Sequence, residues 1–111
     1  MRRDHLSRTF AALADPTRRA MLARLTEGPA TVTELATPHA MSLPSVSRHL
    51  KVLEQAGLVE KGRSAQWRPC HLNTAPLAEA DAWMAPYRSF FETRFARLAE
   101  QLANERPKED A

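Results

Sequence analysis

The residues best suited to chemistry are gathered in a short polar run near the middle of the chain. Hydroxyls, an imidazole and two cations follow one another there, with a proline among them: Ser42, Pro44, Ser45, Ser47, Arg48, His49 and Lys51. Serine, lysine and arginine side chains hydrogen-bond phosphate oxygens, and a guanidinium also matches the two acceptors on the major-groove edge of guanine. The run therefore predicts non-covalent recognition of a polyanion.

A second basic group follows a few residues later and consists of Lys61, Arg63, Gln66 and Arg68. Residues 41–72 hold five Lys or Arg against two Asp or Glu, whereas residues 73–111 hold five against seven. A solvated basic surface without a partner would give the same charges, so charge alone does not decide. The concentration of positive charge favours a polyanion partner for the middle segment and another role for the C-terminal third.

The sequence shows no pattern typical of a catalytic site. Asp15, Glu34 and His49 lack catalytic spacing, and there is neither a glycine-rich phosphate loop nor a nucleophile elbow. We therefore expect neither an enzyme nor a bound cofactor. With no apolar run of membrane-spanning length, no signal-peptide pattern and a single cysteine, Cys70, we expect a cytoplasmic protein without a membrane partner.

Turn and capping signals predict a mainly α-helical fold with a small β-hairpin. Asp15 precedes a proline at a helix start, Thr31 and Glu34 fit a capping box, and Ser42 fits a third N-cap. The expected elements are helices over about 5–14, 16–26, 31–37 and 42–56, a hairpin over 58–72 and a long helix over about 76–104. We expect Pro86 to kink or break the last helix around residues 82–86. Residues 1–104 are expected to form a single domain, and residues 105–111 a flexible tail.

The order of these elements is that of a winged helix-turn-helix domain. Residues 31–56 form the helix-turn-helix and residues 58–72 the wing, so the polar run lies on the second helix, which enters the major groove of DNA in this motif. Arg48 is expected to contact a base edge, because it lies opposite the apolar residues of its helix. Lys51 is better placed for phosphate, and Arg63 in the wing turn for phosphate or the minor groove. The predicted partner is double-stranded DNA.

Three stretches resemble the arsenic-repressor (ArsR) family of winged-helix regulators. They are residues 10–19 (FAALADPTRR), 45–53 (SVSRHLKVL) and 56–59 (AGLV), and the likeness extends over about residues 5–103. The resemblance implies a homodimer that is assembled through the first and last helices. It also implies that the fourth helix reads DNA, and that the protein represses transcription until a signal relieves the repression. A two-fold dimer predicts an inverted-repeat operator.

The sequence departs from the ArsR pattern at the metal sites. Thiol-sensing members carry nearby cysteines in the third helix, but residues 34–40 contain none, and no histidine follows His71. Adjacent residues of a strand point to opposite faces, so Cys70 and His71 cannot both face one ion. We therefore expect no metal site, and interpret Cys70 as a small wing residue rather than a redox switch.

The C-terminal third carries an apolar stripe. Packing within a single monomer is one interpretation, but a winged-helix domain of this size has limited apolar surface to cover it. Together with two residues of the first helix it gives the predicted dimer interface: Leu6, Phe10, Trp83, Tyr87, Phe90, Phe91, Phe95, Leu98 and Leu102. A two-fold homodimer is the simplest way to bury such a stripe. Two alternatives use the same aromatic residues, namely a protein-interaction module that binds DNA weakly or not at all and a regulator that binds a small molecule.

Overall fold

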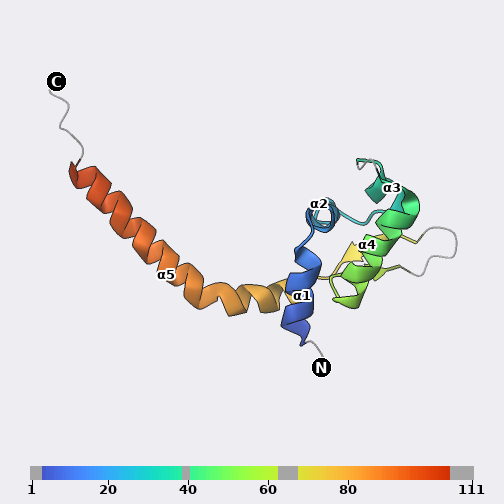
Figure 1. Ribbon diagram of the computed structural model, residues 1–111, viewed down its shortest axis with the longest axis horizontal. Helices are drawn as coiled ribbons and strands as arrows, with labels where there is room; N and C mark the ends of the chain where they lie inside the picture. Colours follow the sequence, from blue (N-terminus) through green and yellow to red (C-terminus); the bar gives the residue numbers. More distant parts are fainter. Residues whose placement is uncertain (1–3, 39–40, 63–67, 106–111) are drawn as a thin grey trace, which may run out of the picture. The chain divides into compact units, whose positions relative to one another are not determined.

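The computed structural model describes residues 4–38, 41–62 and 68–105 and divides into two units, Met1–Ala80 and Asp81–Ala111. Figure 1 shows the elements in chain order. They are α1 (His5–Leu13), α2 (Pro16–Leu25), α3 (Val32–Ala36), α4 (Leu43–Gln55), β1 (Val59–Lys61), β2 (Cys70–Leu72) and α5 (Ala75–Glu105). The mainly helical fold with one small hairpin is the one that the sequence predicts.

Side-chain caps explain where the first four helices begin. Asp4 accepts a hydrogen bond from the Ser7 backbone N–H at 2.7 Å, and Asp15 caps α2 in the same way. Thr31 forms the predicted capping box with Glu34, and the Ser42 hydroxyl accepts from the Ser45 N–H at 3.3 Å. These caps satisfy backbone donors that no intrahelical partner can reach. The three N-caps predicted from sequence are thus confirmed.

The core of the first unit lies where α2, α3 and the hairpin pack against α4. Val46, Leu50 and Leu53, which follow one another at helical spacing, have no exposed surface. The other buried members come from every element of this unit: Ala12, Met21, Leu22, Leu25, Ala30, Leu35, Ala36, Ala56, Leu58, Val59, Cys70 and Ala80. Because one face of α4 is held by this core, the opposite face is left at the surface.

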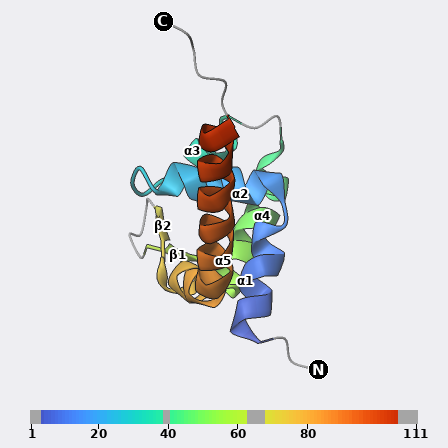
Figure 2. The ribbon, with the colours of Figure 1, turned by 90° about the vertical axis from the view of Figure 1, so that its left-hand side faces the viewer.

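The end of α4 and the hairpin are joined by a left-handed glycine. Gly57 has φ +77°, and its N–H and that of Leu58 donate to carbonyls in the last turn of α4. The two strands are antiparallel, with Glu60 opposite His71, and they lie side by side in Figure 2. They are shorter than the predicted runs, and Cys70 also forms a bridge with Ala30 that the sequence does not signal.

Pro86 was expected to kink or break the last helix around residues 82–86, and no break occurs, because α5 is a single helix from Ala75 to Glu105. Proline removes one backbone donor, but the neighbouring turns still hydrogen-bond, and the helix runs on to Glu105. Of its residues only Ala80, in the first unit, is buried. Of the predicted tail at 105–111, Glu105 belongs to α5, and residues 106–111 lie outside the described residues. The wing tip at 63–67, which includes Arg63 and Gln66, also lies outside them.

Candidate nucleic-acid interface

The outer face of α4 is built from the polar run that the sequence singles out. Ser42, Pro44, Ser47, Arg48 and Lys51 are exposed. This face is opposite the three buried residues that anchor α4 in the core, so anchoring one face orients the other. The exposed residues therefore form one continuous surface on the predicted recognition helix.

Three side chains of the polar run form a hydrogen-bonded chain at the start of α4. The Ser42 hydroxyl donates to Ser45 Oγ at 3.0 Å, and Arg48 Nη2 donates to the same oxygen at 3.2 Å. Since Ser45 Oγ accepts both bonds, its own proton remains available for an acceptor outside the protein. The guanidinium has five N–H donors and uses one here, so it keeps donors for a second group as well.

The hairpin is tied to α4 by a charge pair. Lys61 Nζ on β1 lies 3.3 Å from Glu54 Oε1 on α4. This pairing partly neutralises Lys61, whereas Arg68, just before β2, is exposed and has no ion-pair partner among the described residues. Within the described part of the hairpin, Arg68 is therefore the cation best placed to contact a phosphate.

Sequence reasoning missed the role of Arg18. This residue lies in one of the stretches that resemble the family, but its contact with α4 was not predicted. Its Nη1 lies 3.2 Å from His49 Nδ1, and its Nε donates to the Ala12 carbonyl at 2.7 Å. His49, predicted to face DNA, is half-buried on the side of α4 that meets Arg18. The sequence did contain a signal. A cation in the first turn of a helix is disfavoured by the helix dipole, so Arg18 is expected to have a partner outside its own helix.

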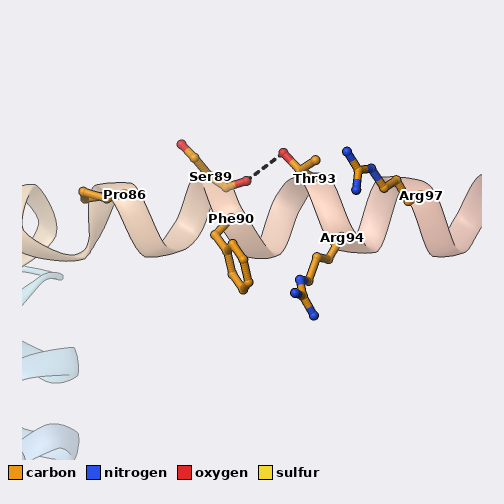
Figure 3. Close-up of a pocket in the computed structure, with 6 residues that line it drawn as sticks. All are labelled: Pro86, Ser89, Phe90, Thr93, Arg94 and Arg97. Atoms are coloured by element: carbon orange, nitrogen blue, oxygen red, sulfur yellow. Dashed lines mark hydrogen bonds between the residues drawn. The ribbon is translucent and has the colours of Figure 1, made fainter.

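The apolar stripe of α5 is exposed over most of its length. In the second unit the exposed members are Trp83, Met84, Tyr87, Phe90, Phe91, Phe95, Leu98 and Leu102. Figure 3 shows a shallow surface depression on this helix, where the Thr93 hydroxyl donates to the Ser89 carbonyl and Arg94 lies on the same side as Phe90. The Arg94 guanidinium carbon is 4.3 Å from the Phe90 ring centre, a cation–π contact.

The two residues of the wing that were considered for a metal point apart. Cys70 has no exposed surface and His71 is exposed. Burial raises the pKa of the Cys70 thiol, so it stays protonated near neutral pH. Across the described residues no three His, Cys, Asp or Glu side chains converge as metal ligands, and no described helix is long and apolar enough to cross a membrane.

Comparison with known proteins identifies the family. Residues 13–62 match a family described as a helix-turn-helix domain. The transcriptional repressor SdpR of Bacillus subtilis is 37% identical over 79 residues, which cover 71% of this chain and 88% of SdpR. A crystal structure of an ArsR family transcriptional regulator matches with a TM-score of 0.73 and 43% identity, covering 80% of this chain and 98% of that one. The chain belongs to the ArsR family of transcriptional regulators.

A more distant ArsR-like structure agrees on the architecture. The solution structure of the homodimeric winged helix-turn-helix DNA-binding domain of Mb0332 from Mycobacterium bovis matches with a TM-score of 0.60. The two are 24% identical, and the match covers 85% of this chain and 84% of that one. The winged helix-turn-helix fold predicted for this ArsR family chain is confirmed.

Proposed function

We propose that this ArsR family chain is a homodimeric, sequence-specific DNA-binding repressor whose α4 reads base edges. The observation that carries the proposal is the outer face of α4, where hydroxyl and guanidinium donors are held together by hydrogen bonds and keep further donors for a ligand. A preorganised donor set loses less conformational entropy on binding than free side chains would. The relative SdpR is itself a transcriptional repressor.

Within this surface, Arg48 and Ser45 are the proposed base-reading pair. The guanidinium can contact guanine O6 and N7 together, and the Ser45 hydroxyl can donate to a neighbouring acceptor. Ser42, Pro44 and Ser47 are small, so they let the helix backbone approach the groove closely. Lys51, a turn further along α4, is proposed to bind phosphate and fix the register of the protein on the duplex.

The wing is proposed to add contacts to the backbone of DNA beside the major groove. Arg68 is the described residue assigned to this role, because it is exposed and unpaired among the described side chains. Arg63 and Gln66, which lie outside the described residues, stay part of the sequence prediction for the same contacts. A phosphate contact of this kind increases affinity on all sequences and makes binding sensitive to salt.

The exposed stripe of α5 is proposed to bury itself against a second copy of the chain. Phe91, Phe95, Leu98 and Leu102 follow one another at steps of three and four residues, and each is at least half exposed. Apolar surface of this extent on a helix is normally covered by a partner, and an identical helix offers a matching stripe by symmetry. The family resemblance adds Leu6 and Phe10 of α1 to this interface.

The signal that regulates DNA binding is proposed not to be a metal ion. The third-helix stretch 34–40 has no cysteine, and no histidine follows residue 71. Zinc requires several convergent N, S or O ligands. Adding zinc, cadmium or arsenite should leave operator affinity unchanged within about 0.5 kcal/mol, below the coupling of a typical allosteric ligand. Tight stoichiometric zinc binding that releases DNA would contradict this.

Selection of bound sites from random duplex DNA with the purified protein tests the main proposal. The enriched site should be an inverted repeat with half-site centres roughly 10 bp, or a multiple of this, apart. A site without two-fold symmetry would argue against the dimer, and failure to enrich any motif would argue against DNA reading. In the second case the exposed stripe would favour a protein-interaction module instead.

A further inference from the structure

Arg18 connects three helices behind the recognition surface. It is the third residue of α2, and its guanidinium reaches back over the end of α1. Nε donates to the Ala12 carbonyl at 2.7 Å and Nη2 to the Ala11 carbonyl at 3.1 Å. The remaining nitrogen, Nη1, lies 3.2 Å from Nδ1 of His49 on α4. All three guanidinium nitrogens are therefore used, each on a different acceptor.

This geometry determines the hydrogen-bonding state of the His49 ring. A guanidinium can only donate, so Nδ1 of His49 is the acceptor in this contact, which requires the ring proton to lie on Nε2. The Asp15 carboxylate faces the same ring nitrogen but stands 3.8 Å away, beyond hydrogen-bond distance. The His49 side chain is only 20% exposed, so the ring is enclosed on the side where Arg18 holds it.

The contact fixes α4 at the place where its rotation matters most. His49 follows Arg48 directly, and it lies one helical turn beyond Ser45. The apolar residues of α4 hold the helix against the core but are not directional, whereas a hydrogen bond to a planar, bonded guanidinium is. A small rotation of α4 about its axis would move the Arg48 guanidinium away from a base edge and break the bond to His49 together.

We propose that Arg18 is a positioning residue for sequence reading, which acts through Nδ1 of His49 to set the rotation of α4. The inference rests on the proposed function, in which α4 reads DNA. It gives His49 a role other than base contact: its ring transmits the position of α2 and the end of α1 to the reading face. Arg18 itself touches no DNA in this scheme.

A double-mutant cycle separates positioning from direct contact. Arg18→Met, His49→Phe and the double variant are measured on the selected operator and on a scrambled duplex by fluorescence anisotropy. Each single variant should bind the operator about tenfold more weakly, with a much smaller loss of affinity for the scrambled duplex. The double variant should lose no more affinity for the operator than the weaker-binding single variant does. Losses that multiply in the double variant would mean that His49 contacts DNA independently of Arg18, and would overturn the proposal.

Arg19→Met is the matched control for charge and for packing at the end of α1. Arg19 is also an arginine of α2 that donates to a carbonyl at the end of α1, here Leu13 at 2.7 Å, but it makes no contact with His49. Arg19→Met should therefore keep the ratio of operator to scrambled affinity. If it lowers this ratio as much as Arg18→Met does, the loss comes from the α1 contact and the proposed route through His49 is wrong.

Two further measurements keep the test decisive if Arg18→Met folds poorly. His49→Asn places a side-chain amide oxygen near the position of Nδ1 and should recover operator affinity to within about threefold, whereas His49→Gln should not. Nitrogen-15 NMR of the His49 ring, without DNA, should show the Nε2–H tautomer in the parent protein. A predominant Nδ1–H tautomer would overturn the contact itself, while a parent protein that fails to distinguish operator from scrambled duplex would overturn the proposed function instead.

Discussion

Helix α4, which carries the proposed DNA-reading surface, and helix α5, which carries the aromatic stripe, differ in how much of their apolar surface the chain itself covers. In α4 the side chains of Val46, Leu50 and Leu53 have no exposed surface, and the polar residues face outward. In the second unit, α5 exposes its large apolar side chains, among them Phe95 at 65%. The first unit thus covers the apolar surface of α4 apart from Leu43 and Val52, whereas α5 exposes an apolar stripe of the kind that a partner normally covers.

The largest effect of a substitution is expected where a charge is placed in the α5 stripe. Phe95→Glu should dissociate the dimer, because a two-fold interface contains the substitution twice and each lost aromatic anchor contributes about 2 kcal/mol or more. We expect the dimer dissociation constant to rise about 1,000-fold, measured by analytical ultracentrifugation. Ala96→Glu, one residue further and outside the stripe, is the control and should leave the dimer intact. A parent chain that is monomeric at micromolar concentration would contradict the proposed interface.

The same substitution in the two helices should give effects of different kinds. Leu53→Ala on α4 removes a fully buried side chain and should lower the free energy of unfolding by about 2–5 kcal/mol at every protein concentration. Leu98 is 50% exposed, so Leu98→Ala should destabilise the protein only where the dimer forms. Chemical denaturation over a hundredfold range of protein concentration distinguishes the two. Equal, concentration-independent losses would mean that α5 is buried within one chain.

Within the first unit, the reading face and the wing should differ in sequence dependence. Arg48→Ala should weaken operator binding by about 1–3 kcal/mol and binding to random DNA much less, since it removes a base contact. Arg68→Ala should weaken both by similar factors and lower the slope of affinity against salt by about one unit. Anisotropy titrations with both duplexes over a salt series measure this. Equal losses on both duplexes for Arg48→Ala would make it a phosphate contact.

The smallest expected effect concerns the Asp4 N-cap of α1 in the first unit. The backbone hydrogen bond from Ser7 lowers the pKa of the Asp4 carboxyl below its usual 3.8. The ionised Asp4 carboxylate therefore stabilises the folded state above that pH, and this stabilisation is lost as the pH falls through the lowered pKa. Asp4→Asn keeps a capping oxygen but cannot titrate, so the stability difference between the two proteins should change only below about pH 5. Urea midpoints at several pH values test this, and an unchanged difference down to pH 2 would contradict it.

The sequence by itself determined the order of the elements and their starting points, because caps and helical spacing are local. The Thr31–Glu34 capping box, the Asp15 and Ser42 caps and the apolar face of α4 were all predicted from residues within a few positions of each other. The exposed residues on the outer face of α4 followed in turn, since a helix buried on one side exposes the other. For the same reason the stripe of α5 could be recognised as apolar without knowledge of its neighbours.

Only the tertiary structure decided which of these residues meet across the chain. The Arg18 contact with His49 joins residues 31 positions apart, and no local rule pairs them. Likewise the bridge between Ala30 and Cys70 and the pairing of Lys61 with Glu54 depend on where the hairpin packs. Helical periodicity specifies a face of a helix, but whether a polar side chain near its edge meets solvent or another side chain depends on the packing of the neighbouring helix. His49 lies at such an edge, so its sequence position alone could not show that its ring meets Arg18.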